Sequence, residues 1–147
     1  MIGHKISPKI WIASVGEKYK EELSECKSDD GWSVPSKSRI NDLILFYHNK
    51  PESCIKDIFK ITGEIHKDVA GEYTVKRCDY FAPIKRVARI KLPITFQEMK
   101  NDPYLSGSHM VLTCMNGRFE VTEYWDHIYK MIIKKNPELE NKLSPYL

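Results

Sequence analysis

The chain has 147 residues, of which 41% are hydrophobic and 29% charged. This length suits one domain, residues 1–147, and the composition excludes a disordered chain. The 23 basic and 20 acidic residues leave a formal net charge of +3, which permits nucleic-acid binding without arguing for it. The longest apolar run, "LILFY", is far below the ~20 residues of a membrane span, and the N-terminus lacks a secretory pattern, so we expect a cytoplasmic protein.

The first half of the chain predicts three strands and one helix. Residues 8–15, "PKIWIASV", favour a strand because they are rich in β-branched side chains, and "EKYKEELSEC" favours a short surface helix. Residues 42–48, "DLILFYH", are apolar on both alternating faces and predict a strand that is covered on both sides. Residues 54–65, "CIKDIFKITGEI", are expected to pair with it as a hairpin. Between helix and hairpin lies Trp32, which we place in a loop because Gly31, Ser33 and Pro35 surround it.

The second half begins with a long extended region, residues 72–94, in which Pro83 predicts a bend, a bulge or a break between two strands. Strict alternation would put Lys85, Arg89 and Lys91 together on one basic face, opposite Arg86.

A short helix should start at Thr95, because Glu98 three residues later completes a capping box. We expect a last strand over residues 108–115, "SHMVLTCM", and then a turn, "NGRF". A closing helix, with Thr122 as its N-cap, follows over residues 121–136. Its core-facing stripe is Trp125, Ile128, Tyr129, Ile132 and Ile133.

This order of elements predicts an α+β fold built on a mostly antiparallel sheet, and the strand count would let the sheet curl into a small barrel flanked by helices. The four cysteines and five histidines are scattered and match no metal-ligand spacing, so we expect reduced thiols, no metal site and no cofactor.

Sequence patterns of catalysis are missing. The chain has no glycine-rich phosphate loop and no G-x-S-x-G elbow, so we expect a protein that is not an enzyme. Aromatic and polar residues instead gather at strand ends: residues 32–37, Tyr47 with His48, and residues 115–118. Together they suggest a pocket in which a base stacks on an aromatic face and polar groups orient it. Each also has an ordinary interpretation, with Trp32 as a lid on the core, Tyr47 as a strand residue and Arg118 as a surface charge.

The stretch "GWSVPSKSRINDLILFYHNKPESCIKDIFKITGEI" resembles the EVE domain family in three parts. Trp32, Val34 and Pro35 match a W-x-V-P-type loop, "ND" with "FY" matches a turn and strand, and the isoleucines of residues 55–61 match the next strand. "PITFQEMKNDPYL" and "GRFEVTEYWDHI" continue the resemblance, which covers about residues 8–135. Asn41 stands where the family prefers glycine, and asparagine readily adopts a positive φ. "TCMNGRF" is shorter than the "R-Q-x-R-x-S" run of many relatives.

The resemblance implies a PUA-like curled β-barrel, related to YTH and ASCH domains, that binds RNA or DNA and accepts a modified base, such as a methylated cytosine or adenine, in an aromatic pocket. It also implies a protein partner from a restriction or RNA-processing system. The expected base-binding residues are Trp32, Ser33, Val34, Pro35, Lys37, Ala13, Ser14, Tyr47, Met115, Asn116 and Arg118. In this picture the backbone of Ala13 and Ser14 forms a strand edge that hydrogen-bonds the base. The expected phosphate contacts are Lys37, Arg39, Lys85, Arg89 and Lys91.

Two other functions stay open at this point. A nucleoside-directed hydrolase or small-molecule binder would need a base beside Trp32, for which Asp30, Lys37 and Glu120 are the candidates. A protein-interaction module would use the exposed aromatic residues to bind a partner instead.

Overall fold

The computed structural model describes residues 7–26, 30–67 and 80–147. The elements are β1 (Ile10–Val15), α1 (Lys20–Ser24), β2 (Asp30–Val34), β3 (Leu43–His48), β4 (Cys54–Ile61), β5 (His66–Lys67), β6 (Tyr80–Thr95), α2 (Phe96–Asn101), α3 (His109–Leu112), β7 (Arg118–Glu120), α4 (Trp125–Lys135) and α5 (Glu140–Leu143). Short 3₁₀ turns precede α1, α4 and α5 and end the chain. Among these residues no helix is long and apolar enough to cross a membrane.

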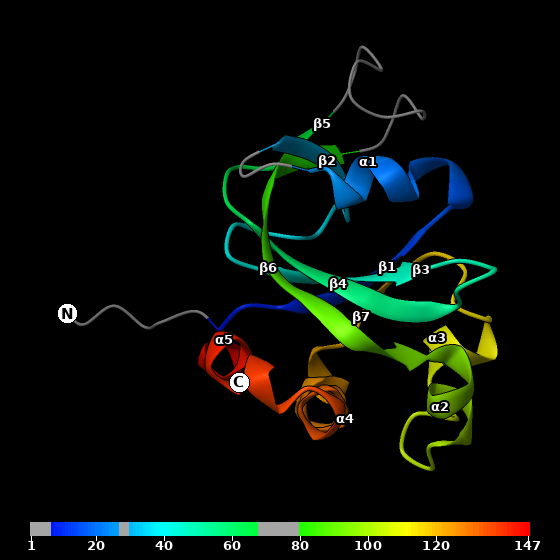
Figure 1. Ribbon diagram of the computed structural model, residues 1–147. Coiled ribbons are helices and arrows are strands. Elements are labelled where there is room, and N and C mark those ends of the chain that lie inside the picture. Colours follow the sequence, from blue (N-terminus) through cyan, green and yellow to red (C-terminus); the bar gives the residue numbers. More distant parts are fainter. Residues whose placement is uncertain (1–6, 27–29, 68–79) are drawn as a thin grey trace.

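The described strands form one curled sheet in the order β2, β6, β4, β3, β1, β7, with β5 paired to β6 (Figure 1). All pairs are antiparallel except β1 with β3. The curl has a local cause in β6, where the pairing with β4 shifts register twice, once around Val87 and again between Arg89 and Ile94. Extra residues on one strand bend it and increase its twist. The bends therefore lie at these points, and Pro83 lies in a regular part of the pairing.

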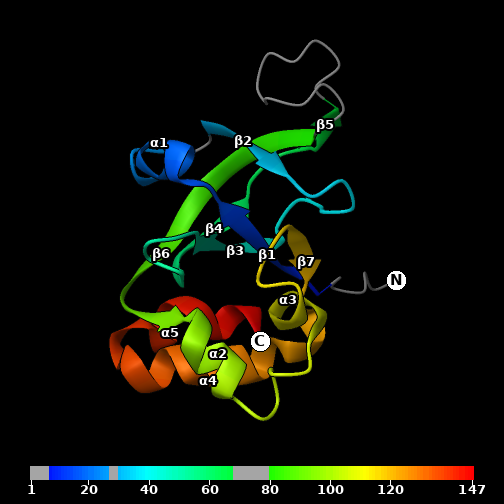
Figure 2. The same ribbon diagram turned by 90° about the vertical axis from the view of Figure 1, so that its right-hand side faces the viewer.

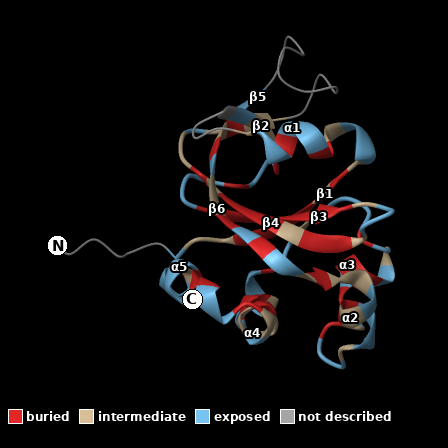
Figure 3. Ribbon diagram, in the orientation of Figure 1, coloured by how far each residue is buried: buried red, intermediate tan, exposed pale blue. Residues whose placement is uncertain are grey.

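The sheet separates two hydrophobic cores. The concave-face core consists of Trp11, Ala13, Val15, Leu23, Val34, Ile44, Phe46, Phe59, Ile61, Ala82 and Ile84. The convex-face core joins the opposite side chains of the same strands, such as Ile12, Leu45 and Ile58, to Met99 of α2 and Ile128 of α4. In Figure 1, α1 covers the concave face and α2 to α5 lie against the convex face. β3 is buried at every position because both of its faces are covered, as its apolar sequence predicts (Figure 3).

Three sequence-based predictions of secondary structure were wrong, wholly or in part. Trp32 lies in strand β2, opposite Ala82, so Gly31 and Ser33 do not keep it in a loop. Residues 109–112 form helix α3 instead of a strand, with Met110 and Val111 buried. A short apolar run fits a buried strand or a buried helical turn equally well, because periodicity does not separate them. The last strand is β7, over part of the expected "NGRF" turn.

Three other local predictions are confirmed, and the prediction of Thr122 as an N-cap is wrong. Thr95 caps α2 in a reciprocal capping box with Glu98, and Asn41 adopts a φ of 75°. α4 buries Trp125 together with Ile128, Tyr129 and Ile132, as its spacing predicts. Thr122 is not a side-chain cap, since its hydroxyl accepts a hydrogen bond from the backbone N–H of Ile10. The extended region was predicted to begin at residue 72, and its part before residue 80 lies outside the described residues.

Candidate nucleic-acid interface

Arg118 connects the two ends of the curled sheet. β2 and β7 are the outermost strands of the main strand order, yet the Nη1 group of Arg118 donates to the backbone oxygen of Val34 over 3.2 Å, and its Nη2 group donates to the hydroxyl of Ser33. Figure 2 shows β2 and β7 on the same side of the molecule, beside the loop between β2 and β3. A side chain, in place of a strand ladder, therefore joins these two ends.

Trp32 lies next to this junction and is neither fully buried nor fully exposed. It projects to the concave face, where its ring meets the edge of Phe46 in a T-shaped contact with centroids 6.1 Å apart. Phe46 in turn contacts Phe59 at 5.4 Å. The indole is thus held from the core side, while part of it remains accessible at the sheet end. Both interpretations of the sequence, core lid and site wall, describe part of this environment.

The loop after Trp32 divides into a buried start and an exposed remainder. Val34 belongs to the concave-face core, and Pro35 is buried with its carbonyl accepting hydrogen bonds from Ser38. Lys37 and Arg39 are exposed. The backbone N–H of Arg39 donates to Asp42, which also accepts from the indole of Trp11 at 3.0 Å. Buried Asp42 therefore fixes the shape of a loop that presents two cations to solvent.

β1 does not offer a free edge to a ligand, contrary to the sequence-based expectation. The strand lies between β3 and β7, with Ala13 opposite Phe46 on one side and Arg118 on the other. The backbone N–H of Ser14 donates to the carbonyl oxygen of Gly117. The short strand β7 occupies this edge because the turn before it, with Cys114 and Met115 at positive φ, directs the chain back along β1. Asn116 is exposed in that turn.

Tyr47 and Met115 lie on the other face of the sheet from Trp32. Both are buried in the convex-face core, whereas Phe46, the neighbour of Tyr47, contacts Trp32. Alternation along β3 separates adjacent residues in this way. Burial raises the pKa of the Tyr47 hydroxyl above its ordinary value. The structure therefore does not bring Tyr47 and Met115 together with Trp32.

The expected basic face of β6 is also divided. Lys85 lies opposite Lys60, whose other partner Leu43 belongs to the convex-face core, so Lys85 projects from the convex face. The bulge at Val87 reverses the alternation, and Arg89 pairs with Asp57 on the concave face. Lys91 lies two positions after Arg89, so by the same alternation it also projects from the concave face. Strict period-2 reasoning failed because it cannot anticipate an inserted residue.

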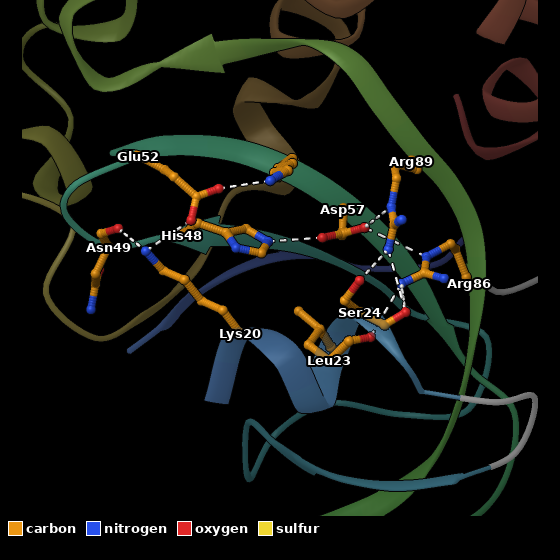
Figure 4. A network of polar contacts seen from close by, with 10 residues as sticks. Lys20, Leu23, Ser24, His48, Asn49, Glu52, Asp57, Arg86 and Arg89 are labelled. Carbon is orange, nitrogen blue, oxygen red and sulfur yellow. Dashed lines mark hydrogen bonds and ion pairs between the residues drawn. The ribbon is translucent and has the colours of Figure 1, made fainter. Parts of the chain in front are cut away.

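Arg89 instead belongs to a polar network under α1 (Figure 4). Asp57, 1% exposed, accepts from His48 at 2.8 Å and lies 3.4 to 3.5 Å from the Nε atoms of Arg89 and Arg86. Both arginines also donate to the last carbonyl groups of α1, and Arg86 lies 4.9 Å above the ring of Phe59. Burial alone would raise the pKa of Asp57, but the hydrogen bond from His48 and the two guanidinium charges outweigh it and lower that pKa.

This network was not found from the sequence. His48, Asp57 and Arg86 are nine to thirty-eight residues apart in the chain and match no motif. Asp57 at a buried strand position was the available signal, because a buried carboxylate needs cationic or hydrogen-bonding partners. The network positions α1 over the concave face and leaves Arg89 committed to protein contacts.

The candidate catalytic groups have separate positions. Lys37 is exposed in the loop after β2, and Glu120 is exposed in β7, where its carboxylate lies 3.8 Å from the ammonium group of Lys9. The backbone of Asp30 pairs with Ile84 at the start of β2.

The curled sheet with helices on its convex side defines a PUA-like domain. Its relatives agree with this class. The chain belongs to the EVE domain family, whose model matches residues 9–134. A comparison with curated proteins gives no match.

Solved structures with the same fold are distant in sequence. A hypothetical protein from Leishmania major has a TM-score of 0.71 at 18% identity, covering 88% of this chain and 98% of that chain. Rpa0253 from Rhodopseudomonas palustris has a TM-score of 0.64 at 19% identity, covering 84% and 92%. ASCH from Zymomonas mobilis has a TM-score of 0.61 at 10% identity, covering 83% and 94%. These likenesses concern the fold.

Proposed function

We propose that the protein is a non-catalytic nucleic-acid-binding module that holds one unstacked base against Trp32. The observation that carries the proposal is the position of this indole, fixed from the core side by Phe46 and partly accessible beside the junction of β2 and β7. Bases stack on such fixed aromatic faces with ~1–3 kcal/mol per base. RNA and DNA are both candidates, because stacking does not depend on the sugar.

Polar groups that could orient the base lie within the same few residues. The guanidinium group of Arg118 lies at the junction, where it donates to the hydroxyl of Ser33, and guanidinium groups pair with the edges of bases. The exposed cations Lys37 and Arg39 lie in the loop that continues from β2 and are suited to phosphate contacts. Tyr47 and Met115 have no part in this site, because they belong to the convex-face core.

A methyl group on the base is the finer part of the proposal. The neighbours of Trp32 on the concave face are apolar, including Val34 and Phe46, and burial of one methylene-sized group contributes ~0.8 kcal/mol. We therefore expect a methylated oligonucleotide to bind about fourfold tighter than its plain counterpart.

The test is fluorescence anisotropy with labelled single strands, RNA and DNA, methylated and plain. Trp32→Ala should weaken binding by at least about fivefold, from the lower limit of base stacking, and abolish the preference for methyl. Tyr104→Ala is the matched control, since it removes another aromatic side chain, 53% exposed, from the segment between α2 and α3. If a folded Trp32→Ala variant binds every strand as the parent does, the proposal is wrong. A preference lost only in Tyr104→Ala would favour an interaction surface elsewhere.

A further inference from the structure

We propose that a bound single strand continues from the Trp32 site onto the convex face of the sheet, with phosphates at Lys60 and Lys85 and a base on the His66–Phe81 ring pair. The inference rests on the proposed function, because it extends the path of the same ligand. It names a second contact surface, termed here the convex track, which consists of Lys60, His66, Phe81 and Lys85.

The register of the sheet places these four side chains on one face. Lys60 of β4 lies directly opposite Lys85 of β6, and His66 of β5 lies directly opposite Phe81 of β6. Residues 81 and 85 are separated by an even number of positions in a stretch of β6 without a register shift, so their side chains project from the same face. Ala82 and Ile84, between them, belong to the concave-face core.

Lys60 and Lys85 form a pair of like charges. Like charges directly opposite one another in a sheet are destabilising. Neither ammonium group has an ion pair or a hydrogen bond with the part of the chain that the structure describes. The contrast is with Lys20, Lys56 and Lys135, each of which has a carboxylate partner within 3.0 Å. An uncompensated pair that the fold does not require favours an anionic ligand.

The other end of the track is aromatic. The ring centroids of His66 and Phe81 are 5.4 Å apart with an interplanar angle of 32°, and His66 is exposed. Phe81 is half-buried, and aromatic rings on the face of a sheet are a common stacking platform for single strands. Ser33 lies opposite Phe81 on its other side, and Ser33 is the residue that Arg118 contacts. The track thus begins at the junction of β2 and β7, beside Trp32.

Pro83 and Gly63 lie between the two ends of the track. Gly63 lies so close to Pro83 that an added Cβ would be 2.5 Å from the proline ring, so a larger side chain is excluded there. Lys85 lies four positions after Phe81 in β6, which is about 13 Å of strand. Figure 1 shows β5 and this end of β6 at the opposite end of the molecule from α4 and α5, so these helices do not cover it.

A single strand fits these features better than a duplex. The bases of a duplex are stacked on one another and do not present their faces to protein rings, whereas those of a single strand do. Lys60 and Lys85 at one end of the track suit the phosphates of a single strand, and the rings of His66 and Phe81 at the other end suit one of its bases.

The experiment measures anisotropy of a labelled strand of about ten nucleotides as a function of salt, a length within the range of one small nucleic-acid-binding domain. Each phosphate contact on a single strand contributes about 0.7 to the slope of log K against log salt concentration. For Lys60→Gln/Lys85→Gln we expect the slope to decrease in magnitude by about 1.4, with the methyl preference unchanged. His66→Ala should weaken binding about fivefold or more without changing the slope.

The matched control is Lys100→Gln/Lys134→Gln, which removes the same charge from exposed positions of α2 and α4. An unchanged slope in the first double variant, or an equal decrease in the control, would overturn the convex track and leave the Trp32 site intact. If the slope decreases in Lys60→Gln/Lys85→Gln and the Trp32→Ala variant binds as tightly as the parent, the track is supported and base binding at Trp32 is refuted. Binding of acidic protein but of no oligonucleotide by the parent would refute both.

Discussion

Two stretches of β6 carry positive charge and differ in what balances it. Around the bulge, Arg86 and Arg89 share buried Asp57 and donate to the carbonyl groups of α1. Four residues before Arg89, Lys85 lies opposite Lys60 with no acidic partner among the described residues. The first stretch uses its charge to hold the fold together, and the second leaves its charge for a ligand. Counting basic residues in the sequence does not separate these two roles.

The largest expected effect comes from removing the charge of Asp57, which balances Arg86 and Arg89. Asp57→Asn removes the charge that His48, Arg86 and Arg89 share and leaves two guanidinium groups without their anion. Loss of one partner of a fully buried ion pair typically lowers the free energy of unfolding by ~3–5 kcal/mol, and we expect the lower end of this range because the side chains of Arg86 and Arg89 are partly exposed. Urea denaturation of Asp57→Asn and of the parent measures this change in the free energy of unfolding. Asp126→Asn, in an exposed pair with Lys130, is the control and should change stability by less than about 1 kcal/mol. Equal effects in the two variants would show that the network does not hold the fold together.

Removal of the Arg118 bridge should have a smaller effect. Arg118→Ala loses the hydrogen bonds to Val34 and Ser33 that join the ends of the sheet, each with a net contribution of ~0.5–1.5 kcal/mol. We expect the free energy of unfolding to fall by about 1 kcal/mol, because the side chain is exposed, and amide hydrogen exchange in β2 to accelerate. Exchange that accelerates equally in β4 would mean that the bridge does not act locally.

Acid should weaken the contacts that the carboxylates of Glu52 and Asp57 make with their cationic partners. Hydrogen bonding from Lys56, with help from Lys20, lowers the pKa of Glu52 from 4.5 to about 2, and that of Asp57 is also lowered. The unfolded chain therefore binds protons at a higher pH than the folded chain, and the stability from these carboxylates is present above their ordinary pKa and lost as pH falls through the folded values. The free energy of unfolding should decline between about pH 4.5 and 2. Lys56→Met should shift this decline to higher pH, and an unshifted decline would contradict the assignment.

The smallest expected effect tests the repulsion between Lys60 and Lys85. Lys60→Glu converts the opposed like charges into an opposite-charge pair with Lys85, which should raise the free energy of unfolding by ~0.2–1 kcal/mol. The same variant should bind single strands more weakly, so stability and binding change in opposite directions. Lys56→Glu, which disrupts an existing pair with Glu52, should not stabilise. A Lys60→Glu variant that gains nothing in stability would mean that the two lysines do not repel each other.

Prediction from sequence succeeded where a local rule decides the structure. The capping box at Thr95, the covered strand at β3 and the buried stripe of α4 all follow from spacing within a few residues. The family resemblance supplied the barrel topology, which composition and periodicity only allowed.

The candidate site was harder to predict because its residues come together through long-range pairing. Phe46 and Tyr47 are adjacent in the sequence, and they project into different cores. One bulge at Val87 moved Arg89 to the face opposite Lys85. The bridge from Arg118 to β2 joins residues more than eighty positions apart, and no sequence pattern encodes it.

The most direct test of base binding at Trp32 is an NMR titration of ¹⁵N-labelled protein with a short methylated single strand. The indole N–H of Trp32 should shift the most among the three tryptophans, together with the backbone amides of Ser33 and Arg118, because Trp11 and Trp125 are buried. An unchanged indole signal of Trp32, together with strong signal changes around Tyr104 or the helices, would contradict base binding at Trp32.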